Sequence, residues 1–292
     1  MRHAVLGAGG VGAFLGAALA RAGRDVLLLM REESLARYGG RAHVESAVLG
    51  DFDAALPAAP TLERPVDVVW VATKATQLAD ALERVPDGAA EDSLVVPLLN
   101  GLDHVELLRR QFGPTAVLPA AIVIESERVE PGLVRQLSGF ASVVLSPAPQ
   151  AEELRDELVA AGITASIGAD ETSVLWRKLA VLAPIALTTT LRGFAFDGVL
   201  ADPDCRRRLE ECVREVAAAA RADGVMLDAD ELIARLENVP PGLRSSMQKD
   251  RGAGRPTEIE AIGGSVLRAA ARHGLEAPTT QALVDGIRAG EP

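Results

Sequence analysis

Lys178 stands at the start of a long stretch of chain without charge. In SVLWRKLAVLAPIALTTTLRG, Ser173 to Gly193, the next charged residue after this lysine is Arg192. A lysine in such surroundings either extends its ammonium group to water or works in a cleft. A partly desolvated lysine has a lowered pKa and can protonate an oxygen that gains charge when a hydride reaches a ketone. The segment therefore suggests a general acid for a reductase.

A carboxylate late in the chain could assist this lysine. Glu258, in RPTEIEAIGG, could accept a hydrogen bond from a substrate hydroxyl or tune the pKa of Lys178. The pattern alone favours a simpler role, in which Glu258 is a first-turn acid that complements a helix dipole.

The N-terminal segment VLGAGGVGAFLGAALARAG carries a G-x-G-x-x-G pattern at Gly7, Gly9 and Gly12. The first glycine allows a tight turn, the second lets the backbone approach a pyrophosphate, and the third lets the helix pack on the strand. The pattern alone is weak evidence for a dinucleotide site, because glycine is common in turns. Here an apolar strand precedes it and an alanine-rich helix follows it. We therefore predict a dinucleotide site at Gly7, Gly9, Gly10, Val11 and Gly12.

The end of the second predicted strand bears on the choice of cofactor. An NAD site usually carries an acid there, whereas LLLMREES places Arg31 at that point. A guanidinium would pair with the 2′-phosphate of NADP. Arg31 could instead be a surface arginine that begins the following helix, and the adjacent Glu32 and Glu33 could weaken a phosphate site. The sequence favours NADPH as the cofactor.

Two polar residues follow apolar strands at the edge where α/β sheets bind ligands. Lys74 ends VATK, and Asn100 ends the run before Gly101 in LLNG. Both are candidates for contact with nicotinamide or substrate. Lys74 could equally be an ordinary lysine at a helix start, and Asn-Gly is also a common turn dipeptide.

Two kinds of domain must position these residues. RHAVLG, DVLLLM, DVVWVAT and SLVVPLL are short apolar runs separated by helical patterns, which is typical of a parallel sheet with both faces covered. HVESAVL, AVLPAAIVIE, GLVRQLS and ASVVLS indicate further strands, some of them antiparallel, and ITASIGA the last. From Asp170 onward only helical spacing remains. We predict an α/β fold, with an N-terminal Rossmann-type doubly wound sheet over residues 1–168 and a C-terminal all-α domain over residues 169–292.

Composition excludes several classes of partner. The net charge of −11 argues against nucleic acid and anionic membranes, because both require a basic surface. We see no signal peptide and no apolar run that would span a membrane, and we expect a cytoplasmic protein. Cys205 and Cys212 are expected to be buried free thiols on one helix face. The four histidines are scattered, so no metal site is expected.

The chain resembles the ketopantoate reductase family, whose members reduce 2-dehydropantoate to pantoate with NADPH. The matching pieces are LGAGGVG, MRE, TKA, LLNGL, WRKLAV, ECVREV, SSMQKD and TEIEAIGG, which occur in family order over essentially the whole length. The resemblance implies a Rossmann domain followed by a helical domain, an active site in the cleft between them, and a small 2-keto acid as substrate. A homodimer through the helical domain is one possible assembly. The implied roles are proton donor for Lys178, substrate contact for Glu258, carboxylate contact for Ser246, cleft residues for Asn100 and Lys74, and 2′-phosphate contact for Arg31.

The chain departs from the family pattern after Lys178. The family helix carries asparagines one and two turns after the lysine, where this chain has Leu182 and Ala186, and Phe196 lies near a third polar position. Apolar side chains cannot supply the missing hydrogen bonds. The threonines that begin at Thr188 could compensate, but threonines in apolar helices more often bond back to the backbone.

Three functions follow as alternatives. The first is NADPH-dependent reduction of a 2-keto acid, either 2-dehydropantoate to (R)-pantoate or a more apolar 2-keto acid. The second is a dehydrogenase of the β-hydroxyacid or opine type, which the late SSM and TEI segments disfavour. The third is a non-catalytic NADP-binding or sensing protein. Retention of both Lys178 and Glu258 argues against it.

Overall fold

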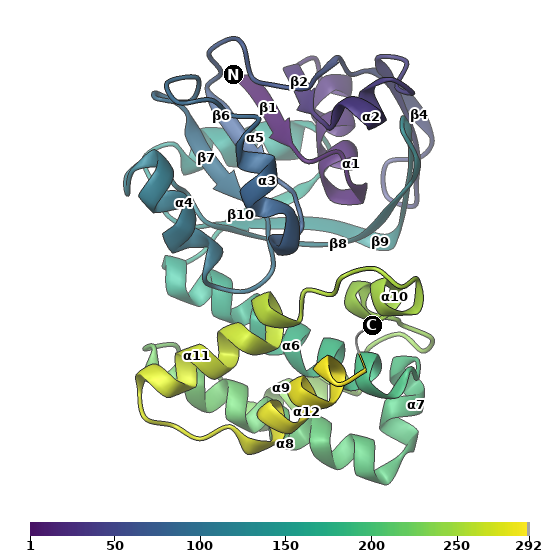
Figure 1. The fold of residues 1–292 in the computed structure, drawn as a ribbon, viewed down its shortest axis with the longest axis vertical. Helices are drawn as coiled ribbons and strands as arrows, with labels where there is room; N and C mark the ends of the chain where they lie inside the picture. The colour runs from purple at the N-terminus through teal and green to yellow at the C-terminus, as the bar shows by residue number, and fades with distance from the viewer. Residues whose placement is uncertain (291–292) are drawn as a thin grey trace. The chain divides into compact units, whose positions relative to one another are not determined.

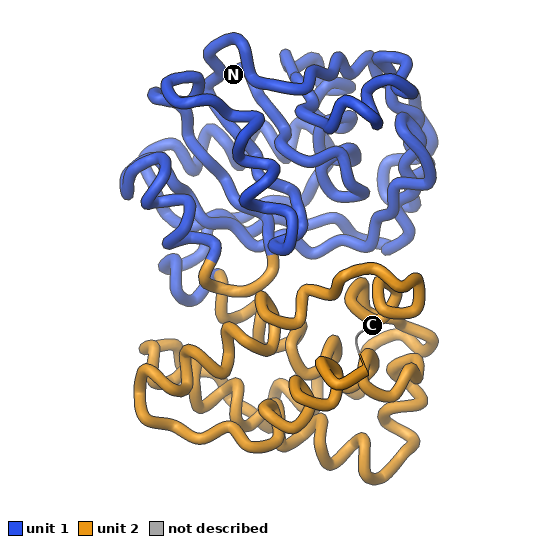
Figure 2. Tube along the Cα trace, viewed as in Figure 1, with its two compact units in different colours: residues 1–99, 104–174 blue, residues 100–103, 175–292 orange. Residues whose placement is uncertain are grey.

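The structure, a computed structural model, describes residues 1–290, which fall into two compact units (Figures 1 and 2). The first unit comprises Met1–Leu99 and His104–Val174. The second comprises Asn100–Asp103 together with the chain from Leu175 onward. The boundary between the units lies after Val174, whereas we predicted it after residue 168, and the short segment near residue 100 that belongs with the later part of the chain was not predicted.

A five-stranded parallel sheet lies in the first unit, with its strands in the order β5-β2-β1-β6-β7. The chain moves from β1 outward to β2 and β5 and then returns to β6 on the other side of β1. This reversal is the point where open α/β sheets bind ligands, outside the carboxyl ends of the strands. Four of the strands are the predicted apolar runs. The strands are β1 (Arg2–Leu6), β2 (Asp25–Leu29), β5 (Ala58–Ala59), β6 (Val68–Val71) and β7 (Leu94–Pro97).

A second, mixed sheet completes the first unit. Its strands run in the order β10-β9-β3-β4, and β8 pairs with β9 in antiparallel fashion. The segments GLVRQLS and ASVVLS, which the sequence suggested as two strands, form one long strand, because pairing with β8 continues across them. The strands are β3 (Arg41–Ser46), β4 (Phe52–Ala55), β8 (Ala120–Glu130), β9 (Leu133–Leu145) and β10 (Thr164–Ile167).

Helix α1 (Gly10–Arg21) contacts both sheets, β1 and β2 on one side and β3, β4, β8 and β9 on the other. A helix covered on two sides must be apolar around its circumference. Its sequence GVGAFLGAALAR meets this requirement, and Phe14, Leu15 and Leu19 are fully buried. The shorter helices of this unit are α2 (Glu32–Leu35), the 3-10 turn η1 (Ala75–Gln77), α3 (Leu78–Leu82), α4 (His104–Phe112) and α5 (Ala151–Ala160).

The second unit is helical, as predicted, and the structure describes no strand after Ile167. Asp202, Asp228 and Ser245 cap three of its helices by accepting hydrogen bonds from first-turn amides. Cys205 and Cys212 are free and buried, as expected. The helices are α6 (Glu171–Arg192), α7 (Phe196–Ala201), α8 (Pro203–Ala222), α9 (Ala229–Leu236), α10 (Ser246–Gly252), the π-helical turn η2 (Glu260–Gly264), α11 (Ser265–Arg272) and α12 (Pro278–Arg288).

Helix α6 is long and apolar enough to cross a membrane by length and composition, which the sequence analysis did not anticipate. However, 72% of its apolar window is buried inside the fold. Leu179, Ala183 and Leu187 belong to the hydrophobic core of the second unit. These contacts are typical of a core helix, which needs the same composition for a different reason.

Candidate functional site

The glycine-rich turn follows β1 and lies against the chain that leaves β6. Gly7 has φ +108°, and a Cβ atom added to it would lie 2.8 Å from Cγ2 of Thr73. A Cβ atom on Gly12 would lie 2.0 Å from the carbonyl oxygen of Gly7. By contrast, nothing lies within 4 Å of the Cβ position of Gly9. The first and third glycines therefore permit close packing, while the second leaves its backbone open to approach, as a pyrophosphate requires.

Helix α1 begins directly after this turn. Its first hydrogen bond runs from the amide of Ala13 to the carbonyl of Gly9, at 3.0 Å. The amides of Gly10, Val11 and Gly12 come before it and are available to an anion, as at other helix N-termini. The turn and the helix start therefore fit the diphosphate of a dinucleotide.

Gly10 has a second reason to be glycine. A Cβ atom added to it would lie 2.3 Å from the carbonyl oxygen of Ser126 on β8. The second sheet thus approaches the start of α1 so closely that only glycine fits. The sequence analysis assigned Gly10 to the cofactor alone, because the contact with β8 is made across 116 positions of sequence.

Arg31 and Lys74 lie at the carboxyl ends of strands in this same unit. Arg31 follows β2, is exposed, and begins α2. Neither Glu32 nor Glu33 forms an ion pair with it among the described residues. Lys74 follows β6 and begins η1, so its position agrees with both the cleft role and the helix-start role.

Lys178, Glu258 and Asn100 come together in the second unit. Burial lowers the pKa of Lys178 to about 8, and the Glu258 carboxylate acts on it in the opposite direction. Glu258 is itself buried, and its Oε2 accepts a hydrogen bond from Nδ2 of Asn100 at 3.1 Å. A lysine with this pKa is largely protonated near neutral pH and gives up its proton more readily than an exposed one. This arrangement can deliver a proton to a bound oxygen.

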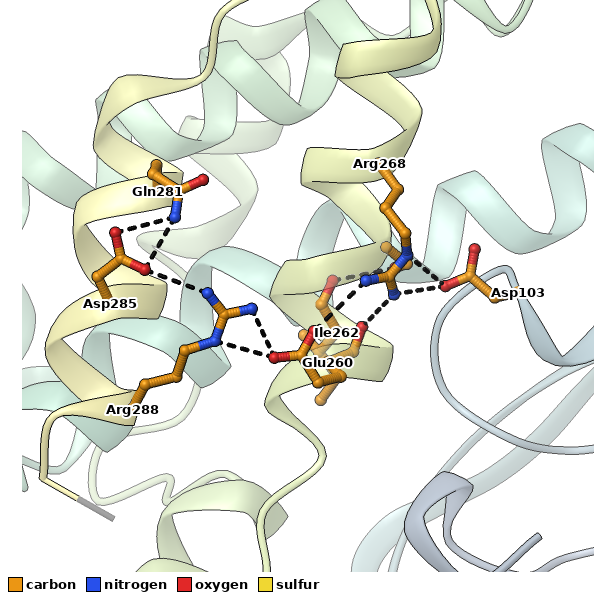
Figure 3. A network of polar contacts seen from close by, with 8 residues as sticks. Asp103, Glu260, Ile262, Arg268, Gln281, Asp285 and Arg288 are labelled. Carbon is orange, nitrogen blue, oxygen red and sulfur yellow. Dashed lines mark hydrogen bonds and ion pairs between the residues drawn. The ribbon is translucent and has the colours of Figure 1, made fainter. Parts of the chain in front are cut away.

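The segment Asn100–Asp103 contacts the rest of the helical unit at several residues. Gly101 has φ +85°, and a Cβ atom on it would lie only 1.9 Å from the carbonyl oxygen of Ala261 in η2. Leu102 packs against the hydrophobic core of this unit. Asp103 accepts hydrogen bonds from Nε and Nη2 of Arg268, at 3.2 and 2.6 Å (Figure 3). Together with the bond from Asn100, these contacts fix the segment against η2 and α11.

A polar network continues from Arg268 toward the C-terminal helix. Arg268 donates to the carbonyl oxygen of Glu260 at 2.6 Å, and the Glu260 carboxylate accepts from Arg288 (Figure 3). Arg288 also pairs with Asp285 at 3.2 Å. The network lies around η2, a π-helical turn. Such turns occur often at functional sites.

Ser246, the remaining candidate of the second unit, forms no described contact with the cluster of Lys178, Glu258 and Asn100. Ser246 is the first residue of α10 and is exposed. Within residues 1–290 its hydroxyl forms no hydrogen bond with another residue. Its neighbour Ser245 caps the helix and bonds to Thr189 at 3.0 Å. Ser246 is therefore accessible to a ligand, but no described contact ties it to Lys178.

The residues that depart from the family pattern have two different environments. Ala186 and Phe196 are buried in the core of the second unit, whereas Leu182 is only partly buried, one helical turn after Lys178. Thr188 and Thr189 donate to the carbonyls of Pro184 and Ile185, both at 2.7 Å. The expectation that these two threonines bond back to the helix is confirmed.

Each unit thus holds part of the predicted set. The glycine turn, Arg31 and Lys74 belong to the first, and Asn100, Lys178, Glu258 and Ser246 to the second. Asp103 and Arg268 were not predicted, because nothing in their spacing along the sequence indicates their ion pair. The described residues contain no group of three or more His, Cys, Asp or Glu side chains able to hold a metal ion.

Comparisons with known proteins agree with this architecture. The family model "Ketopantoate reductase PanE/ApbA" matches residues 3–150, and its C-terminal counterpart matches residues 171–291. A 2-dehydropantoate 2-reductase of Mycobacterium tuberculosis is 36% identical over 227 residues, which is 75% of each chain. The crystal structure of a PanE/ApbA family ketopantoate reductase from Ralstonia eutropha JMP134 has a TM-score of 0.91 and 25% identity, covering 100% of this chain and 98% of that one.

A second solved structure is also similar in fold. D-mandelate dehydrogenase, solved with NADH and anilino(oxo)acetate, has a TM-score of 0.88 and 24% identity, covering 100% of this chain and 98% of that chain. At this identity the likeness concerns the fold alone. The two family matches and the Mycobacterium tuberculosis relative carry the assignment, and the chain belongs to the ketopantoate reductase family of oxidoreductases.

Proposed function

We propose that the protein reduces a 2-keto acid with NADPH, and that its substrate is 2-dehydropantoate, which it converts to (R)-pantoate. The observation that carries the proposal is the cluster of Lys178, Glu258 and Asn100. It combines a lysine of lowered pKa with a buried carboxylate that is held by an amide. The name of the Mycobacterium tuberculosis relative supports the choice of substrate.

The glycine turn supports a nicotinamide dinucleotide as cofactor. The amides of Gly10, Val11 and Gly12 would hold its diphosphate, and Gly9 would leave room for it. Arg31 supports NADPH over NADH, because a guanidinium at the end of β2 would bind a 2′-phosphate. Lys74 and Asn100 are proposed to contact the nicotinamide or the substrate.

In this mechanism a bound reduced nicotinamide supplies the hydride to the keto carbon. Lys178 donates a proton from Nζ to the keto oxygen as negative charge develops there. Glu258 keeps the ammonium form of Lys178 populated and, through its bond with Asn100, stays oriented toward it. Ser246 is proposed to hold the substrate carboxylate through its exposed hydroxyl. The products are the 2-hydroxy acid, the oxidised cofactor and a neutral lysine, which regains a proton from solvent.

The direct test is NADPH oxidation by the purified protein with 2-dehydropantoate, beside Lys178→Ala. We expect turnover by the wild type and a loss of roughly 10²- to 10⁴-fold in kcat for the variant, the usual contribution of a general acid. NADPH affinity should change little. NADPH binding without turnover across a panel of keto acids would instead identify a non-catalytic binding or sensing protein.

A second candidate function rests on Leu182. This residue is partly exposed one turn after Lys178, where the family carries a hydrogen-bonding asparagine. The alternative substrate is a 2-keto acid with an apolar branched side chain. The proposal of 2-dehydropantoate requires its kcat/KM to exceed that of branched apolar 2-keto acids, and the reverse order would favour the alternative. A homodimer through the helical unit and a cytoplasmic location stay predictions.

A further inference from the structure

Arg128 lies on a part of β8 that borders the glycine-rich turn after β1. The strand is irregular here, with register shifts between Ile124 and Ser126 and between Arg128 and Glu130. Such bulges redirect side chains and are frequent beside binding sites. The carbonyl of Ser126 lies directly over Gly10, which brings this stretch of the second sheet to the N-terminus of α1.

A small pocket places Arg128 beside residues that adjoin two other arginines in sequence. Its lining includes Ala8 of the glycine turn, Met30 at the end of β2, Tyr38, Gly132 and Arg128 itself. Met30 is followed by Arg31, and Tyr38 is preceded by Arg37. The pocket thus brings Arg128 of β8 beside the segment around α2 that carries Arg31 and Arg37. Burial lowers the pKa of Arg128, and the positive charges of Arg31 and Arg37 lower it further.

These three arginines have no anionic partner within residues 1–290. Other arginines of the first unit do, such as Arg64 with Asp25 and Arg135 with Glu45. The contrast is notable in a chain with 41 acidic residues and a net charge of −11. Like charges held together without a counterion repel one another, and a bound anion would relieve this repulsion.

We propose that Arg37 and Arg128 join Arg31 in one binding site for the 2′-phosphate of NADPH, and that they determine the preference for NADPH over NADH. The inference rests on the proposed NADPH-linked function and deepens it. A phosphate monoester carries about −1.5 to −2 charges at neutral pH and offers three acceptor oxygens. Guanidinium groups from two separate segments, the chain around α2 and strand β8, can approach it from different directions and bind it through charge-assisted hydrogen bonds.

The test measures dissociation constants of NADPH and NADH for the full-length protein by titration calorimetry. The variants are Arg31→Gln, Arg37→Gln and Arg128→Gln. Arg155→Gln is the matched control, because it removes one partly exposed arginine on α5 that pairs with Asp156. We expect Arg128→Gln and Arg37→Gln each to weaken NADPH binding roughly 10-fold or more while NADH affinity changes less than about twofold. Unchanged NADH binding also serves as the check on folding.

A second experiment measures the contribution of the 2′-phosphate to binding without the rest of the cofactor. 2′-AMP should bind the wild type more tightly than 5′-AMP, and this difference should shrink in Arg128→Gln and at high salt. An unchanged ratio of NADPH to NADH affinity in both Arg37→Gln and Arg128→Gln would overturn this inference and leave the proposed function standing. Failure of the wild type to bind either dinucleotide would overturn the proposed function, and this inference with it.

Discussion

Nδ2 of Asn100 donates a hydrogen bond to Oε2 of Glu258 at 3.1 Å, although the two residues lie 158 positions apart. Glu258 is buried and raises the pKa of Lys178 against the effect of burial. The amide therefore holds a carboxylate that in turn supports the charged state of the lysine. Asn100 belongs to the second unit together with both partners. The three residues can be tested as one group.

The reduction rate should fall as the pH rises above about 8. Lys178 must carry its proton to act as an acid, and its pKa is about 8. Below this value the lysine is mostly protonated and the rate is constant, whereas above it the rate falls about tenfold per pH unit. The measurement is kcat against pH from 6 to 10. Lys178→Arg is the control, because arginine does not deprotonate in this range and its residual activity should not show the same fall.

Replacement of Glu258 by glutamine should shift the alkaline decrease of kcat to lower pH. The carboxylate raises the pKa of Lys178, so its removal lowers this pKa further below its ordinary value. The amide of glutamine keeps the size of the side chain and removes the charge. The descending limb of kcat should therefore move toward neutral pH. A limb that stays in place would contradict the role assigned to Glu258.

Gly101→Ala should destabilise the helical unit. Its backbone has φ +85°, and the added methyl group would lie 1.9 Å from the carbonyl oxygen of Ala261. Gly88→Ala is the matched control, because Gly88 has φ +82° and open space around its Cβ position. The control isolates the backbone strain, about 1–2 kcal/mol in the free energy of unfolding, and the overlap at Gly101 should add about 1–3 kcal/mol. Urea unfolding of the two variants measures the difference.

The ion pair between Asp103 and Arg268 should hold the segment Asn100–Asp103 in place. In Asp103→Asn the charge is lost, and the amides of this segment should exchange hydrogen with solvent faster than in the wild type. Because the pair is about half exposed, its contribution to unfolding is small, about 0–1 kcal/mol. KM should rise a few-fold while the global stability changes little.

The control for this pair is Asp285→Asn. It removes a carboxylate at the far end of the same network, which touches Arg288 and Gln281 but not the segment (Figure 3). Hydrogen exchange and KM should match the wild type in this variant. Equal effects of Asp103→Asn and Asp285→Asn would show that the network acts on the stability of the unit as a whole.

Local sequence patterns predicted the parts of the fold that depend on neighbours in the chain. The four apolar runs became parallel strands, and the glycine turn adopts the conformation that its spacing requires. Pairing across long separations was not predictable in the same way. β3 pairs with β9 at Val44 and Val134, and β5 has two residues, too few for a periodic signal.

In the candidate site, too, features that depend on local sequence were predicted, and contacts between distant segments were not. The apolar residues that follow Lys178 in sequence predicted that this lysine is desolvated, and the burial that lowers its pKa agrees with that prediction. The Asn100–Glu258 bond and the approach of Arg128 to Arg31 depend on contacts between distant segments. The simpler role predicted for Glu258, a first-turn acid, was incomplete for this reason. Glu258 lies just before the helical chain that begins at Ile259, the first-turn acid of η2 is Glu260, and the Glu258 side chain accepts a hydrogen bond from Asn100.

Because the chain passes from the first unit to the second at Leu99, returns at Asp103 and passes over again at Val174, the helical unit is not encoded by one continuous stretch of gene. A fragment that begins at Leu175 lacks Asn100, Leu102 and Asp103, and Glu258 loses the hydrogen bond from Asn100. Chimeras between relatives should therefore exchange residues 100–103 together with the C-terminal half. A crossover that ignores this segment would combine one parent's asparagine loop with another parent's π-helical turn.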